Sequence, residues 1–104
     1  MKHKDISSLF NDLKNENQIF LSYLKAKFPL FHNSNFFTKD FQYGLKSFLE
    51  KKSIHLTENN LISLAEQFSK YYESQGIFIK TSTQGWKLNY PDFVTAKPGD
   101  PFSF

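Results

Sequence analysis

Three histidines are the residues of this chain with the widest catalytic and metal-binding chemistry. His3, His32 and His55 lie far apart in the sequence without metal-ligand spacing, and the chain has no cysteine to complete a zinc site. His32 alone lies close to other polar side chains, and it could form an acid–base or nucleophile pair with Asp40 or Ser34. Because the pattern shows neither an orienting third group nor an oxyanion donor, we interpret His32 as a turn residue.

Two glutamates are the second candidate for chemistry. Glu66 and Glu73 are seven residues apart in a predicted helix, so they share its outer face, and paired carboxylates can hydrolyse glycosidic bonds. An outer helix face also carries charge simply for solvation, which we take as the better interpretation. The four glycines are isolated and form no phosphate-binding loop. We therefore expect a protein that is not an enzyme and has no cofactor and no metal ion.

The charged residues of the chain limit the kinds of partner that it is suited to bind. The net charge is +3, and all 13 basic residues are lysine. Arginine supplies the commonest specific contact to guanine, so the chain lacks the usual residue for reading a DNA sequence. An AT-rich genome, which favours Lys, Asn, Phe and Ile codons, would explain the same composition.

The length and composition indicate one small domain. The chain has 104 residues, of which 13 are phenylalanine, and this favours a helical core filled by large side chains. No apolar run approaches the roughly 20 residues of a membrane span. The first residues lack the apolar segment of a secretory signal, so we expect a cytoplasmic protein.

The stretch from Thr57 to Tyr90 dominates the predicted fold. Thr57 is a good helix N-cap, and Gly76 suits a left-handed C-cap, so the helix should end near Gln75. The predicted apolar stripe of this helix is widened by Ile62 and Tyr71. The full stripe consists of Leu61, Ile62, Leu64, Ala65, Phe68, Tyr71 and Tyr72.

A β-hairpin should follow this helix. Residues 77–81 and 86–90 alternate with the period of strands, and Gly85 permits a positive φ in the turn between them. Trp86 and Leu88 share the apolar face of the second strand, which Pro91 should end. We expect Leu88 to be the more buried of the two, and Trp86, near the tip, to be only partly covered.

The preceding residues should form helices that pack against this unit. We predict a helix over residues 5–14, a second from an N-cap at Asn15 to about Lys27, and a third capped by Thr38. Residues 29–37 should be a tight turn with apolar shoulders, and Gly44 should let another element approach closely. Residues 54–56 could add a third strand to the hairpin.

A helix that ends in Gln75-Gly76-Ile77 and is followed by a hairpin with Gly85-Trp86-Lys87-Leu88 resembles the end of a winged-helix domain, in which the last helix precedes a β-hairpin wing. The predicted fold class is therefore α+β: a small domain of three to four helices with a C-terminal β-hairpin, winged-helix-like. It should span residues 1–93, and residues 94–104, rich in Pro and Gly, should form an irregular tail.

The charge of the last helix decides between two functions. In a DNA-binding winged helix it would enter the major groove, but it carries Glu58, Glu66 and Glu73 against Lys70 alone, and phosphates would repel it. The resemblance also implies protein binding and dimerisation. We therefore expect a small non-enzymatic binding module that acts through protein–protein contacts or homodimerisation. The alternative is a DNA-binding transcriptional regulator that uses the hairpin and the lysines of the middle helices.

The predicted partner is accordingly another protein or a second copy of this chain, with nucleic acid as the alternative. We expect no membrane contact and identify no small-molecule substrate. The candidate interaction surface consists of Lys80, Gln84, Trp86, Lys87, Lys51 and Lys52.

Overall fold

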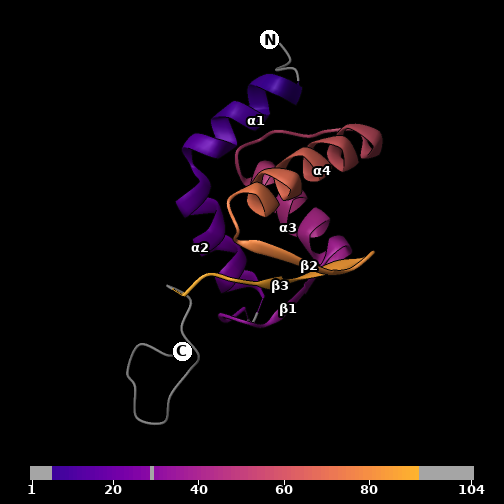
Figure 1. Ribbon diagram of the computed structural model, residues 1–104. Coiled ribbons are helices and arrows are strands. Elements are labelled where there is room, and N and C mark those ends of the chain that lie inside the picture. Colours follow the sequence, from indigo (N-terminus) through magenta and orange to yellow (C-terminus); the bar gives the residue numbers. More distant parts are fainter. Residues whose placement is uncertain (1–5, 29, 92–104) are drawn as a thin grey trace.

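The computed structural model describes residues 6–28 and 30–91, which form four helices and one three-stranded antiparallel sheet (Figure 1). The predicted α+β class, with a C-terminal hairpin, is confirmed. The predicted tail, residues 94–104, lies outside the described residues. The elements in chain order are α1 (Ile6–Asn15), α2 (Asn17–Lys27), β1 (Asn35–Phe37), α3 (Thr38–Lys51), α4 (Glu58–Ser74), β2 (Phe78–Ser82) and β3 (Gly85–Leu88).

Helix α4 is the central element of the packing. It contacts α1, α3 and β2, while α1 and the sheet lie at opposite ends of the molecule (Figure 1). Most of its predicted apolar stripe is buried or partly buried, but Ile62 is 40% exposed, so its inclusion in the stripe was wrong. The fully buried part of the stripe consists of Leu64, Ala65, Phe68 and Tyr72.

Both predicted ends of α4 are confirmed. The Thr57 hydroxyl accepts a hydrogen bond from the Asn60 amide at 3.2 Å, which satisfies a free donor of the first turn. At the other end Gly76 has φ +75°, a conformation that favours glycine. The Asn89 side chain donates to the Gly76 carbonyl at 2.9 Å, so the end of α4 is fastened to the residue after β3.

The sheet has the order β1-β3-β2, so β3 is its middle strand. Phe36 pairs with Trp86, and Trp86 pairs with Lys80 on the other side. The third strand is thus residues 35–37, and its predicted position at residues 54–56 was wrong. Residues 54–56 instead link α3 to α4, with Ile54 and Leu56 packed against the core.

Strand β1 runs directly into α3, and this changes the start of that helix. Thr38 is the first helical residue rather than the N-cap, and its amide donates to the carbonyl of Gln84 at 2.8 Å. The predicted cap at Asn15 was also wrong, because Asn15 is the last residue of α1 and Glu16 precedes α2 without a side-chain capping bond.

Two glycines allow close packing. A Cβ at Gly44 would lie 2.5 Å from Leu24 Cδ2, which confirms the close approach of α2 to α3. Gly85 does not have a positive φ, contrary to prediction. Its hydrogen is needed because a Cβ there would lie 2.9 Å from the Phe36 carbonyl oxygen and 2.9 Å from the Phe37 ring of the paired strand.

Candidate functional site

Trp86, the only tryptophan of the candidate surface, lies in the core. It is 3% exposed, so the expectation of partial cover was wrong, whereas Leu88 at 1% is the more deeply buried, as predicted. The Trp86 Nε1 donates to Glu73 Oε2 at 2.8 Å, and Lys80 Nζ lies 5.5 Å from the ring centroid. The Trp86 ring packs against those of Phe41 and Phe78, with centroids 5.9 Å and 4.8 Å away, so almost none of it is available to a partner.

The other hairpin candidates are at the surface. Lys80, Gln84 and Lys87 are exposed, and Lys80 Nζ donates to the Thr83 carbonyl at 3.5 Å across the turn. The backbone carbonyl of Gln84 accepts a hydrogen bond from the Thr38 amide, so the group that a partner can reach is the exposed Gln84 side chain.

The face of the sheet that is turned away from the core carries two apolar residues that the sequence analysis did not single out. We call this surface the outer sheet face; it consists of Asn35, Phe37, Ile79 and Lys87. Lys87 pairs with Asn35 on one side and with Ile79 on the other. Phe37 is 51% exposed and Ile79 is 46% exposed. Their alternation with the buried Phe36 and Phe78 was the available signal.

Lys51 and Lys52 are far from the hairpin. They lie at or just beyond the end of α3, whose 14 residues extend about 20 Å from β1. Lys52 Nζ forms an ion pair with Glu16 Oε1 at 2.8 Å, and Lys51 Nζ lies 6.0 Å from the ring centroid of Tyr23 on α2. The six predicted residues therefore do not form one continuous surface.

His32 is part of a structural turn. Its Nδ1 accepts a hydrogen bond from the Tyr90 amide at 3.1 Å, and the nearby Ser34 hydroxyl accepts from the Phe31 amide at 3.0 Å. The first bond holds the loop before β1 against the residues that follow β3, and the second lies within the loop itself. Within residues 6–28 and 30–91, no three His, Asp or Glu side chains gather closely enough to hold a metal ion.

Glu66 and Glu73 line a shallow hollow of about 260 Å³ between α3, α4 and the hairpin. Glu73 is already engaged by the Trp86 indole, so one of the two carboxylates positions the hairpin on α4. Lys70, Lys80, Phe41 and Trp86 line the same hollow.

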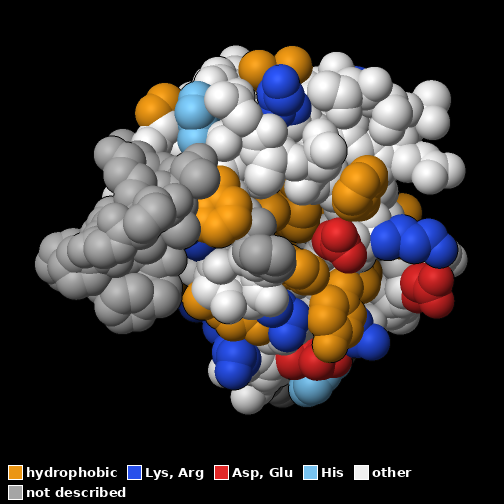
Figure 2. Space-filling view, turned by 90° about the horizontal axis from the view of Figure 1, so that it is seen from below, with side chains coloured by type: hydrophobic (Ala, Val, Ile, Leu, Met, Phe, Trp, Pro, Cys, Tyr) orange, Lys and Arg blue, Asp and Glu red, His pale blue; other side chains and the backbone are white. Residues whose placement is uncertain are grey.

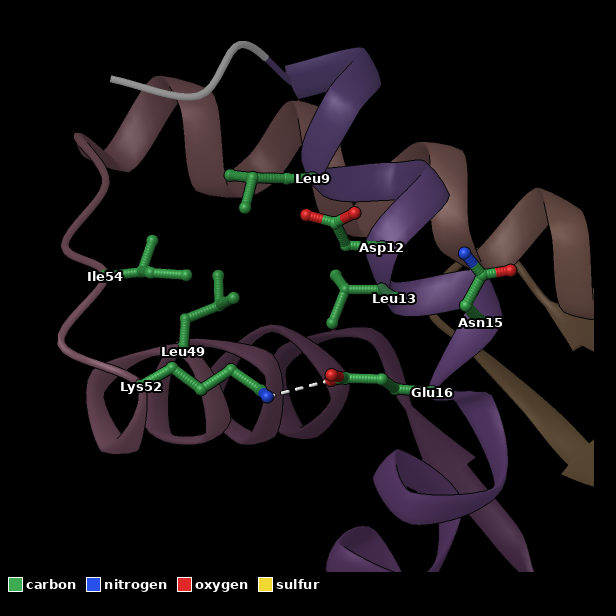
Figure 3. A pocket seen from close by; sticks show the side chains of 8 residues that line it. All are labelled: Leu9, Asp12, Leu13, Asn15, Glu16, Leu49, Lys52 and Ile54. Atoms are coloured by element: carbon green, nitrogen blue, oxygen red, sulfur yellow. Dashed lines mark ion pairs between the residues drawn. The ribbon is translucent and has the colours of Figure 1, made fainter. Parts of the chain in front are cut away.

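A second hollow, of about 340 Å³, lies at the other end of the molecule (Figure 3). Leu9, Leu13, Leu49 and Ile54 point toward one another across it, from α1, α3 and the link after α3. Its rim holds the Lys52–Glu16 ion pair, which joins α3 to the start of α2.

Seen from below the view of Figure 1, the surface shows hydrophobic side chains scattered among lysines and acidic residues (Figure 2). None of the helices in the described part of the chain has the length and apolar character needed to cross a bilayer. Comparisons with protein-family models, with curated proteins and with solved structures give no match to this chain.

Proposed function

We propose that the protein is a small non-enzymatic module that binds another protein, or a second copy of itself, through the outer sheet face. The observation that carries this proposal is the half exposure of Phe37 and Ile79 on one face of the sheet, where Ile79 lies beside Lys87 and Phe37 lies beside Gly85 on the middle strand. Aromatic and aliphatic side chains of this kind are good anchors at protein interfaces, where they become fully desolvated.

The support beneath this face favours a binding role. The opposite face of the sheet presents Phe36, Phe78, Trp86 and Leu88 to the core, where all four are buried. Rigid support reduces the ordering cost that association would otherwise incur. A partner would therefore meet a preformed surface.

The topology supports a winged-helix-like domain. The order is helix, helix, strand, helix, helix and then a hairpin, and the early strand β1 pairs with the last strand of that hairpin. In this interpretation α4 occupies the position of the recognition helix. Its charged residues Glu58, Glu66, Lys70 and Glu73 sum to −2, which favours a protein partner over DNA.

One observation favours DNA binding as a second candidate. Residues 78–88 contain two exposed lysines, Lys80 and Lys87, and no acidic residue. A DNA contact made by this hairpin alone would be weak and sequence-independent, and salt would abolish it. Fluorescence anisotropy with random duplex DNA should then show affinity that falls when both lysines are replaced by alanine.

The protein-binding proposal is tested by affinity capture and mass spectrometry with three matched baits: wild type, Ile79→Lys and Ile62→Lys. Ile62 is a suitable control because it is also exposed but lies on α4. We expect a partner that wild type and Ile62→Lys both retain and that Ile79→Lys loses. Sedimentation equilibrium of the same three proteins distinguishes self-association from a foreign partner. Equal recovery with all three baits, together with equal monomeric mass, would contradict the proposal.

A further inference from the structure

Helices α2 and α3 lie side by side and antiparallel, and lysine–tyrosine contacts cross between them. Lys27 Nζ of α2 lies 4.9 Å from the Tyr43 ring centroid, and Lys51 Nζ of α3 lies 6.0 Å from that of Tyr23. Between these contacts the Tyr23 hydroxyl forms a hydrogen bond with the Ser47 hydroxyl. The contacts hold two lysine stems over aromatic rings, so these charges are partly ordered before any partner arrives.

We call the solvent side of this helix pair the α2–α3 face. Lys39, Asp40 and Lys46 belong to it because they are three or four residues from Tyr43 on α3, and Ile19 belongs to it because it is four residues before Tyr23 on α2. The face consists of Ile19, Tyr23, Lys27, Lys39, Asp40, Tyr43, Lys46, Ser47, Glu50 and Lys51.

The face has a net positive charge. Its four lysines oppose two carboxylates, Asp40 and Glu50, and α2 contains no acidic residue. The exposed side of α4, in contrast, has an excess of glutamate. Four positive and two negative charges give the face a net charge of +2, which attracts an anionic partner.

The same face carries the two most exposed large hydrophobic side chains among the described residues. Ile19 is 63% exposed and Tyr43 is 59% exposed. A phosphate backbone would cover Ile19 with charged groups and gain nothing from its desolvation. A partner that offers apolar side chains beside carboxylates would match both features of the face.

We propose that the α2–α3 face binds an acidic amphipathic segment of another protein. Such a segment places apolar residues on Ile19 and Tyr43 and carboxylates on the surrounding lysines, in the manner of a helix laid along a groove. An anionic bilayer is a poorer match, because it would desolvate the Tyr23–Ser47 hydroxyl pair and repel Glu50. A peptide can accommodate both with its own polar groups. This interface is separate from the outer sheet face.

The test measures anisotropy of a fluorescein-labelled helical peptide of about 18 residues, with Glu on one side and Leu on the other. The expected dissociation constant is on the order of 10 μM at about 50 mM salt, and a scrambled peptide of equal composition should bind at least about fivefold more weakly. Lys27→Glu with Lys46→Glu should weaken binding about tenfold or more. The matched control, Lys80→Glu with Lys87→Glu, makes the same change of net charge on the hairpin and should stay within about twofold of wild type.

A second pair of matched variants measures how much the exposed isoleucine contributes to peptide binding. Ile19→Ser should weaken binding about fivefold, whereas Ile62→Ser on α4 should change it less than about twofold. Thermal melts confirm that each variant is folded.

The proposal is overturned if both charge variants lose affinity equally, if the scrambled peptide binds as well as the amphipathic one, or if the peptide does not bind. It is also overturned if single-stranded oligothymidine or phosphatidylserine vesicles bind more tightly than the peptide at about 150 mM salt. Ile79→Lys should leave this affinity unchanged, so failure here and failure of the outer sheet face are separate results.

Discussion

The two ends of the core are filled in different ways. Beneath the sheet, Phe41 is surrounded by other rings, with ring centroids 5.4 Å from Phe78 and 5.9 Å from Trp86. At the opposite end, Leu9, Leu13, Leu49 and Ile54 border a hollow of about 340 Å³ (Figure 3). The first end is a continuous aromatic cluster beside a hollow of about 260 Å³, and the second is an aliphatic corner beside the larger hollow.

This difference shows which part of the molecule is suited to hold a fixed surface. Interlocked rings leave few alternative side-chain arrangements, so the sheet they support has a well-defined position. The aliphatic corner already contains space, and small changes there can be absorbed by neighbouring side chains. The outer sheet face therefore lies over the more rigidly packed of these two ends of the core.

The largest effect is expected for Phe41→Ala. Phe41 is 1% exposed, and its large side chain contacts several other rings as well as the hollow of about 260 Å³. Its removal should therefore lower the free energy of unfolding by about 3–5 kcal/mol. Leu13→Ala is the matched change in the aliphatic corner. It should cost about 2 kcal/mol, the low end for leucine, because the site already adjoins open space.

Urea denaturation of both variants measures the comparison. Equal losses for Phe41→Ala and Leu13→Ala would show that the two ends of the core are equally rigid.

Leu88→Ala is expected to have the next largest effect. Leu88 lies in the middle strand and is 1% exposed, so its truncation should cost about 2–5 kcal/mol. Trp86→Phe keeps a ring in the cluster but loses the hydrogen bond to Glu73, and should cost only about 1–2 kcal/mol. Thermal melts distinguish the two variants. A Leu88→Ala protein as stable as wild type would contradict the strand register.

The sequence predicted well those features that depend on local spacing. The extent of α4 followed from the Thr57 cap, the apolar period and Gly76, and the hairpin followed from alternation on either side of a turn. These signals act within a few residues, so no knowledge of distant contacts was needed.

Features that depend on contacts between distant residues were missed. β1 is three residues long and exists because Phe36 pairs with Trp86, 50 positions later in the chain. That pairing also places β3 in the middle of the sheet and buries Trp86. Since no local pattern distinguishes residues 35–37 from residues 54–56, the third strand was assigned to the wrong segment and the cover over Trp86 was underestimated.

Gly44→Ala tests how tightly α2 and α3 are held together. The new methyl group would lie 2.5 Å from Leu24 Cδ2 and 3.1 Å from the Phe28 ring, so side chains must shift. We expect a net loss of about 1–2 kcal/mol, because overpacking outweighs the better helix propensity of alanine. Gly76→Ala, which meets no atom within 4 Å but has φ +75°, should cost about 1 kcal/mol through backbone strain alone. If Gly44→Ala raises the melting temperature instead, the α2–α3 contact is looser than described.

Tyr72→Phe is the smallest expected change and the only one that should stabilise the protein. The Tyr72 hydroxyl is buried in the aromatic cluster without a hydrogen-bond partner among the described residues. Removing it while keeping the ring should raise the free energy of unfolding by about 1 kcal/mol at neutral pH. This change would show that the aromatic end, although tightly filled, contains one unfavourable polar atom.

The effect of Tyr72→Phe should grow at alkaline pH. Burial, with smaller contributions from Tyr71 and Tyr90, raises the pKa of the Tyr72 hydroxyl well above its ordinary value of 10.0. At a pH between 10.0 and the raised pKa, the unfolded chain releases the proton while the folded protein keeps it. In this interval wild type loses about 1.4 kcal/mol of stability per pH unit through this group. The variant lacks this loss, and groups that titrate in both proteins cancel in the difference. Urea unfolding at about pH 8 and about pH 11 should therefore show a gap between variant and wild type that widens at the higher pH. A constant gap would mean that the hydroxyl ionises as easily in the folded state as in the unfolded chain, and a loss of stability at neutral pH would mean that it has a hydrogen-bond partner.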